Sequence, residues 1–175
     1  MTKKFELTSD SIVNLERTLY RIKALSSFGP VTEGDLGGYV ESDRNLDQAG
    51  DAWVSDNARV YGDARVYDNA RVCGDARVCG DAWVRGDACV SGVAWVCGNA
   101  RVCGDEQLEE PPINIIGLPY NVTITPKHIQ VGCKLFKHAE FILLSRSDAE
   151  KETTRNVYYA YHKLICDLIM VKYPG

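Results

Sequence analysis

The stretch GDARVYDNARVCGDARVCGDAWVRGDA (residues 62–88) returns to the same pattern every six residues. The pattern extends over residues 51–105, with Ala at 52, 58, 64, 70, 76, 82, 88, 94 and 100 and Val at 54, 60, 66, 72, 78, 84, 90, 96 and 102. Because each Val follows its Ala by two residues, the two side chains point to the same side of a short strand. The Gly-Asp or Asp-Asn pairs between the strands favour tight corners, since these residues tolerate left-handed backbone conformations.

A unit of six residues is too small to bury its own apolar side chains, so such units must stack on their neighbours. The nine consecutive units resemble the hexapeptide-repeat, left-handed parallel β-helix family. The resemblance implies three units in each triangular coil, Val in the interior, left-handed winding and assembly into trimers. We therefore predict a mainly β protein whose β-helix has about three coils and ends near Asp105, where Glu106 interrupts the Ala column.

The segments before and after the repeat are predicted to form an N-terminal cap over residues 1–50 and a C-terminal β+α part over residues 106–175. Within the cap, residues 10–25 fit either a β-hairpin or a helical stripe, and we favour the hairpin. A β-helix exposes unpaired strand edges at its ends, so covering them is the first role that we expect of these segments.

The C-terminal part shows three short strand patterns, over residues 113–118, 121–125 and 128–136. A helix is predicted over residues 148–172, with an apolar stripe formed by Val157, Tyr161, Leu164, Leu168 and Val171.

The composition indicates a cytoplasmic protein. The seven cysteines are an odd number and four occupy equivalent places in the repeat, which is typical of reduced thiols and not of a disulfide framework. The formal charge of −4 gives no basic surface for nucleic acid, so we expect no direct DNA binding. No stretch approaches the length of a membrane span, and no apolar core follows the first basic residues as in a signal peptide.

Residues 18 apart should lie directly above one another in a coil of three units, about 4.8 Å apart. The position between Ala and Val then gives three outward columns: Trp53, Arg71 and Cys89; Arg59, Arg77 and Trp95; and Arg65, Trp83 and Arg101. In one interpretation these columns only cover and solubilise the faces. In the other, Arg and Trp bind a flat anion such as a nucleotide. The predicted contact set is Arg59, Arg77, Trp95, Arg65, Trp83 and Arg101.

Characterised proteins with this type of helix are often acyltransferases or zinc carbonic anhydrases, and both classes carry histidines on the coils. Residues 51–105 contain no His and no inserted loop, so we predict no catalytic residue, no metal and no cofactor. The alternative is a divergent acyltransferase whose base is His128 or His138. Between these histidines lies Cys133, which on a single strand would face away from both.

The flanking patterns GGYV (residues 37–40), GLPYNVTIT (residues 117–125) and HIQVGC (residues 128–133) resemble hexapeptide-repeat proteins encoded by bacteriophages and prophages. The resemblance implies a bacterial host cell. We predict a non-catalytic homo-oligomer, a trimer by resemblance, that acts against a host defence. It would sequester a nucleotide-like ligand or block a defence protein through its β-helix faces or subunit interfaces. A self-assembling structural scaffold is a further alternative.

Overall fold

The structure is a computed structural model that describes residues 3–116, 118, 120–144 and 157–173. The chain forms two compact units, Met1–Pro112 and Ile113–Gly175. The first unit holds the repeat and the residues before it, and the second holds a small antiparallel sheet with two described helices. Each unit is described here by itself.

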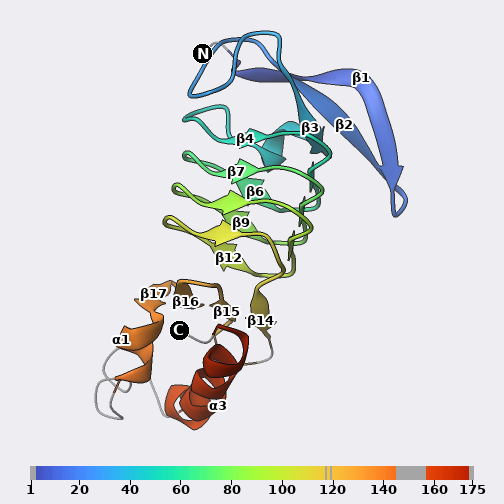
Figure 1. The fold of residues 1–175 in the computed structure, drawn as a ribbon. Coiled ribbons are helices and arrows are strands. Elements are labelled where there is room, and N and C mark those ends of the chain that lie inside the picture. The colour runs from blue at the N-terminus through green and yellow to red at the C-terminus, as the bar shows by residue number, and fades with distance from the viewer. Residues whose placement is uncertain (1–2, 117, 119, 145–156, 174–175) are drawn as a thin grey trace. The chain divides into compact units, whose positions relative to one another are not determined.

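The repeat folds as a parallel β-helix, which confirms the predicted fold class (Figure 1). Each Ala-x-Val unit gives one two-residue strand: β4 (Trp53–Val54), β5 (Arg59–Val60), β6 (Arg65–Val66), β7 (Arg71–Val72), β8 (Arg77–Val78), β9 (Trp83–Val84), β10 (Cys89–Val90), β11 (Trp95–Val96) and β12 (Arg101–Val102). Strands 18 residues apart pair in parallel, as β5 does with β8 and β8 with β11. The rod therefore has three faces, and its left-handed winding stays a prediction from the resemblance.

The stack has about four turns, because partial coils extend the regular units at both ends. Before the repeat, strand β3 (Leu36–Val40) pairs with β5, and Leu46 forms a bridge to Val66. After the repeat, β13 (Gln107–Leu108) pairs with β10, so the helix extends beyond the predicted end at Asp105. Glu106 is buried at an Ala position, and its carbonyl accepts a hydrogen bond from the Cys89 amide at 2.7 Å. A break in the Ala column thus does not stop the backbone pairing.

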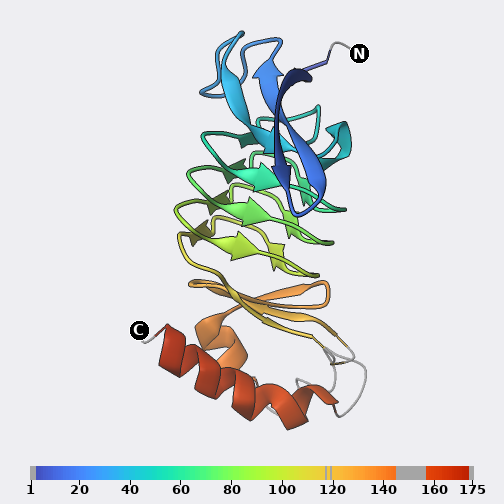
Figure 2. The ribbon, with the colours of Figure 1, turned by 90° about the vertical axis from the view of Figure 1, so that its right-hand side faces the viewer.

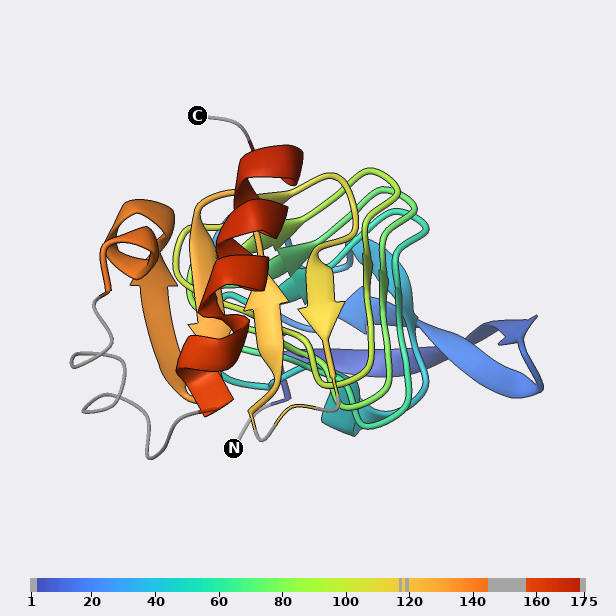
Figure 3. The ribbon, with the colours of Figure 1, turned by 90° about the horizontal axis from the view of Figure 1, so that it is seen from below.

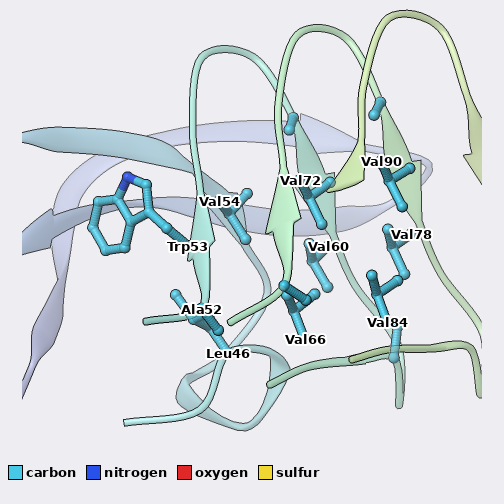
Figure 4. Packing of buried hydrophobic residues seen from close by; sticks show 14 of the residues in the cluster. Leu46, Ala52, Trp53, Val54, Val60, Val66, Val72, Val78, Val84 and Val90 are labelled. Carbon is cyan, nitrogen blue, oxygen red and sulfur yellow. The ribbon is translucent and has the colours of Figure 1, made fainter. Parts of the chain in front are cut away.

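The interior of the rod is built from the Ala and Val columns, all of which are fully buried. Figure 4 shows the valines of successive coils stacked above one another. Each buried Val contributes about 1.5–3 kcal/mol to folding. At the corners, Gly80 has φ +69°, and an added Cβ there would come within 3.0 Å of the Gly98 amide nitrogen. Glycine at this corner therefore suits both the left-handed conformation and the close approach of the next coil, while Asp56 and Asp68 adopt the same conformation at equivalent corners, with φ +57° and +60°.

The N-terminal cap is a hairpin that joins the β-helix, so the structure favours the hairpin over the helical alternative. Strands β1 (Phe5–Asn14) and β2 (Arg17–Ala24) are antiparallel, and β2 pairs with β3 to extend one face of the rod. Figure 2 shows the hairpin running along the side of the coils. The fully buried side chains of Phe5 and Ile22 pack into the same core as the valines and close this end of the stack.

A buried lysine holds the cap against the first coil. The Lys4 ammonium donates to the carbonyl oxygens of Ala49, Gly50 and Ala52, at 3.3, 3.2 and 2.9 Å. Its burial lowers the pKa of Lys4 to about 8, although the nearby carboxylates favour the charged form. The short 3₁₀ helix η1 (Asp43–Asn45) precedes these carbonyls in the chain.

The second unit is a four-stranded antiparallel sheet packed against helices (Figure 3). Its elements are β14 (Ile113–Ile115), β15 (Val122–Ile124), β16 (His128–Val131), β17 (Lys134–Lys137), α1 (His138–Ile142) and α3 (Val157–Lys172). The single strand predicted over residues 128–136 is wrong, because Gly132 with φ +57° turns the chain between β16 and β17. In the described part of the chain, no helix combines the length and apolar character needed to cross a bilayer.

The apolar stripe predicted for the C-terminal helix is only partly correct, because Leu168 packs against the core of the second unit but two other members are exposed. Leu164 and Val171 are 50% and 81% exposed, whereas Ile165 and Ile169 are buried against the sheet. The helix is apolar on most of its circumference over residues 164–171, so periodicity could not select the packed face. The predicted start at residue 148 and the side chains of Val157 and Tyr161 lie outside the described residues.

Candidate functional site

A cleft of about 380 Å³ lies on the face of the rod formed by β6, β9 and β12, where the loop 43–48 rises beside the strands. This volume is within the range of about 300–1,000 Å³ that is typical of small-molecule sites. Its lining residues come from the loop and from the repeat: Asp43, Arg44, Leu46, Asp47, Gln48, Arg65, Val66, Tyr67 and Trp83. The cleft contains Arg65 and Trp83 of the predicted contact set.

The repeat fixes the floor of the cleft. Arg65 pairs with Trp83 in register between β6 and β9, and the Arg65 amide donates to the Ala82 carbonyl at 2.9 Å. Val66 and Val84 are fully buried in the interior. Because successive side chains of a strand point to opposite sides, the preceding residues Arg65 and Trp83 point outward.

The loop 43–48 is attached to the same face by buried contacts. The Asn45 side-chain amide is fully buried and donates to the carbonyls of Gly62 and Ala64, both at 2.9 Å. Leu46 bridges to Val66 and continues the interior column. These contacts place Arg44 and Asp47 beside the strands as fixed walls of the cleft.

The aromatic part of the cleft is ordered by its neighbours. The Tyr67 ring meets the Trp83 ring edge to face, with centroids 6.1 Å apart. The Arg101 guanidinium lies 4.8 Å from the Trp83 centroid, and the indole keeps 36% of its surface exposed. Partial burial raises the pKa of Tyr67 above its ordinary value, although Arg85 and Arg101 oppose the shift, so the phenol remains a hydrogen-bond donor at neutral pH.

The cleft is lined by two acidic and two basic side chains, and the acidic side chains have partners within the protein. Asp43 pairs with Lys3 at 3.3 Å, and Asp47 accepts a hydrogen bond from the Ala49 amide at 3.2 Å. Among the residues that the structure describes, neither Arg44 nor Arg65 takes part in an ion pair. Two guanidinium groups are therefore available to an anion that enters beside Trp83.

The other half of the predicted contact set lies on a different face. Arg59, Arg77 and Trp95 form the outward column of β5, β8 and β11. The Arg77 guanidinium is 5.9 Å from the Trp95 centroid, so the two side chains are neighbours as the predicted column requires. Arg59 instead donates to the Asn14 Oδ1 of the hairpin at 3.5 Å. The six residues thus form two separate groups of three.

The third tryptophan of the repeat is not at the surface. Trp53 is only 7% exposed, and the Phe28 ring of the cap meets it edge to face with centroids 5.4 Å apart. A Cβ at Gly37 would come within 2.8 Å of the Trp53 ring, so glycine makes room for it. Figure 4 shows Trp53 pointing away from the stacked valines. On this face the N-terminal cap therefore covers Trp53, which packs against it instead of facing solvent.

The loop residues Asp43, Arg44, Asp47 and Gln48 were not predicted as part of a site. One signal in the sequence points to their coil, because Val40 and Leu46 are six residues apart, like the valines of the repeat. Leu46 and Val54 are eight apart, so an insertion of two residues hides the continuity.

The histidines considered as alternative bases lie in the second unit and are engaged there. His138 Nε2 donates to the Thr125 carbonyl at 2.8 Å, and its ring lies 5.7 Å from that of Tyr173. His128 is half-buried on β16 opposite Lys137. In the described ranges, no three His, Cys, Asp or Glu side chains are grouped as metal ligands.

The comparisons with known proteins concern the repeat alone. Three overlapping segments, residues 52–68, 64–79 and 70–86, match a family model described as the YdcK Beta solenoid repeat. All three lie inside the β-helix of the structure, so the chain contains a β-solenoid repeat of this type. A search of curated proteins finds no match for the chain.

Proposed function

We propose that the protein is a non-catalytic binding protein whose cleft binds a planar anion, such as a nucleotide. The observation that carries the proposal is the placement of two unpaired guanidinium groups, Arg44 and Arg65, beside the exposed indole of Trp83. Guanidinium groups bind phosphate through paired hydrogen bonds, and an indole stacks on a nucleobase.

The balance of charge in the cleft narrows the ligand to a small nucleotide. Asp43 and Asp47 offset the two arginines, which disfavours a polyanion such as a nucleic acid strand. Asp47 and Gln48 also offer acceptors to sugar hydroxyls or base amines, while the Tyr67 phenol offers a donor. A cleft of about 380 Å³ supports a mononucleotide more readily than a longer chain.

Calorimetric titration with AMP, GMP, CMP and UMP tests the proposal, with adenosine and inorganic phosphate as the two halves of one ligand. We expect saturable binding of at least one nucleotide at one site per chain, and at least about tenfold weaker binding of either half. Arg65→Glu should weaken the binding by about 10- to 100-fold. Arg71→Glu is the matched control, because Arg71 is equally exposed on another face and does not line the cleft. Wild-type protein that binds none of the four nucleotides would contradict the proposal.

We further propose that this binding acts against a bacterial host defence, by sequestering a nucleotide-like signal in the host cytoplasm. The resemblance to phage and prophage hexapeptide-repeat proteins supports this role, and it also supports a trimer. Light scattering should give about three times the 19.4 kDa of the chain. If the role is sequestration, phage infection that depends on the wild-type protein should fail with Arg65→Glu and succeed with Arg71→Glu. Equal success of both variants would instead favour direct blocking of a defence protein.

A further inference from the structure

Two cysteines of the repeat are direct neighbours on consecutive coils. Cys79 follows Val78 on β8, and Cys97 follows Val96 on β11, and the two valines pair in register. The Cys79 amide donates to the Val96 carbonyl at 2.9 Å, which continues the ladder to the cysteines. Both side chains project from the same face, and the neighbouring Cys79 contributes to raising the pKa of Cys97.

The surroundings of the two thiols differ in a way that suits sequential chemistry. Cys97 is exposed, whereas Cys79 is 8% exposed beneath Leu19 of the hairpin. The Trp95 indole N–H donates to Cys79 Sγ at 3.2 Å, and Tyr61 packs in the same cluster as Cys79. A donor aimed at sulfur stabilises the negative charge of a thiolate. The Cys97 thiol is therefore accessible to a reagent in solution, and the buried Cys79 thiol is placed beside it for a second step.

The register separates this pair from the other neighbouring cysteines of the repeat. Paired strands are about 4.8 Å apart, which lies within the Cα separation of about 4.4–6.8 Å that a disulfide accepts. Cys89 also contributes to raising the pKa of Cys73, but Cys89 pairs with Arg71 and is therefore diagonal to Cys73. Diagonal neighbours are about 7–8 Å apart, beyond the reach of a disulfide without backbone movement.

We propose that Cys79 and Cys97 are an oxidisable thiol pair, which a small-molecule disulfide converts into a disulfide bond between consecutive coils. The Cys97 thiolate attacks one sulfur of the reagent, forms a mixed disulfide and releases the first small thiol. Cys79 then attacks the Cys97 sulfur, closes the intramolecular bond and releases the second small thiol. Two protein thiols are oxidised, one reagent disulfide is reduced to two thiols, and the protons of both cysteines pass to the leaving thiolates.

The reaction should be faster in alkaline solution, since the thiolate is the attacking form. Desolvation and the neighbouring Cys79 raise the pKa of Cys97, so little thiolate is present at neutral pH. Closing a loop between consecutive coils restricts the unfolded chain, and the thermal midpoint should rise by about 5 °C. This inference concerns the column of Trp95 and does not rest on nucleotide binding at the cleft.

Incubation of the full chain with oxidised glutathione, followed by peptide mass spectrometry, tests the inference. We expect the wild type to lose two hydrogen atoms in mass and to give a cross-linked peptide that joins Cys79 to Cys97. Cys97→Ser should give no cross-link and no rise in thermal midpoint. The matched control, Cys89→Ser, should behave as the wild type. A stable glutathione adduct on Cys97 without closure, or equal oxidation of Cys73 and Cys89, would overturn the inference.

A second variant tests the role of the indole as a positioning residue. Trp95→Phe keeps an aromatic ring but removes the N–H donor to Cys79. We expect closure of the mixed disulfide to slow by about tenfold, while formation of the adduct at Cys97 keeps its rate. Equal slowing of both steps would show that Trp95 only supports the local structure, and unchanged closure would remove its role.

Discussion

Two outward columns of the β-helix have the same composition and different surroundings. One holds Arg65, Trp83 and Arg101, and the other holds Arg59, Arg77 and Trp95. The first is bordered by the loop 43–48 and opens into a cleft. The second is bordered by the hairpin β1–β2, whose Leu19 packs on the neighbouring column of the same face. The repeat supplies both columns, and the irregular N-terminal segment determines which one forms a binding cleft.

The position of the tryptophan within each column adds to the difference. Trp83 lies between two arginines, and Arg101 lies 4.8 Å from its ring centroid. Trp95 is the last member of its column and directs its N–H to Cys79. In the first column the indole of Trp83 lines the cleft, whereas in the second the indole N–H of Trp95 donates to the thiol of Cys79.

The largest expected effect comes from a substitution that unfolds the β-helix and so disrupts both columns. Val78→Asp places a carboxylate in the closed interior, where the lost apolar burial and the unpaired charge together exceed the stability of an ordinary domain. We expect no cooperative urea unfolding transition by circular dichroism at 25 °C. Arg77→Asp, at the outward position of the same strand, should change the free energy of unfolding by less than about 1 kcal/mol. A folded Val78→Asp protein would contradict the interior assignment.

The second prediction separates the two columns by function. Arg65→Glu should weaken nucleotide binding by about 10- to 100-fold, since charge-assisted hydrogen bonds contribute about 1.5–3 kcal/mol. The same change at Arg77, which lies beside the hairpin and does not line the cleft, should leave the dissociation constant within about twofold of the wild type. Calorimetry on both variants provides the measurement. Equal losses would mean that the columns act together, against the separation seen in the structure.

The third prediction concerns the lysine that holds the cap beside the cleft. Lys4 has a pKa of about 8 in the folded chain, below the ordinary lysine value of 10.5. Between these values the unfolded chain binds the proton that the folded chain has released, so stability rises with pH. Relative to Lys4→Met, the free energy of unfolding should increase by about 2 kcal/mol across this window.

Urea unfolding of both proteins at matched pH values measures the difference. A wild type that loses stability relative to Lys4→Met over the same window would show that the charged form of Lys4 is the favoured one in the fold.

The smallest expected effect lies at the tip of the hairpin. Glu16 has φ +64° although it is not glycine, and the left-handed conformation costs an ordinary residue about 1–2 kcal/mol. After the entropy cost of glycine is subtracted, Glu16→Gly should raise the free energy of unfolding by about 0.5 kcal/mol. Nucleotide binding should not change, because the tip does not line the cleft. A loss of binding would connect the hairpin to the site.

The regular part of the molecule could be predicted from the sequence because its rules are local. The six-residue spacing of Ala and Val determines the strands, and the 18-residue coil determines which outward residues are neighbours. The Arg101–Trp83 and Arg77–Trp95 stacks followed from this register alone. The periodicity gave the six-residue unit, and the resemblance to the hexapeptide-repeat family gave the three units in each coil.

The cleft could not be predicted because its walls depend on contacts without a period. Asn45 is anchored by two carbonyls of a later coil, and Trp53 is covered by Phe28 across a space that Gly37 leaves open. These contacts join residues that are far apart in the chain. They involve backbone carbonyls or a single pair of rings, and neither leaves a repeating pattern in the sequence. The offset of two residues between Leu46 and Val54 was the one local sign of the extra coil.

Tryptophan fluorescence in two single-tryptophan proteins tests most directly whether the cleft is the binding site. The first keeps only Trp83 (Trp53→Phe, Trp95→Phe) and the second keeps only Trp95 (Trp53→Phe, Trp83→Phe). Titration with the nucleotide that binds most tightly should quench the Trp83 emission in a saturable way and leave the Trp95 emission unchanged. Saturable quenching of Trp95 with an unaffected Trp83 would place the ligand on the other column and contradict the account.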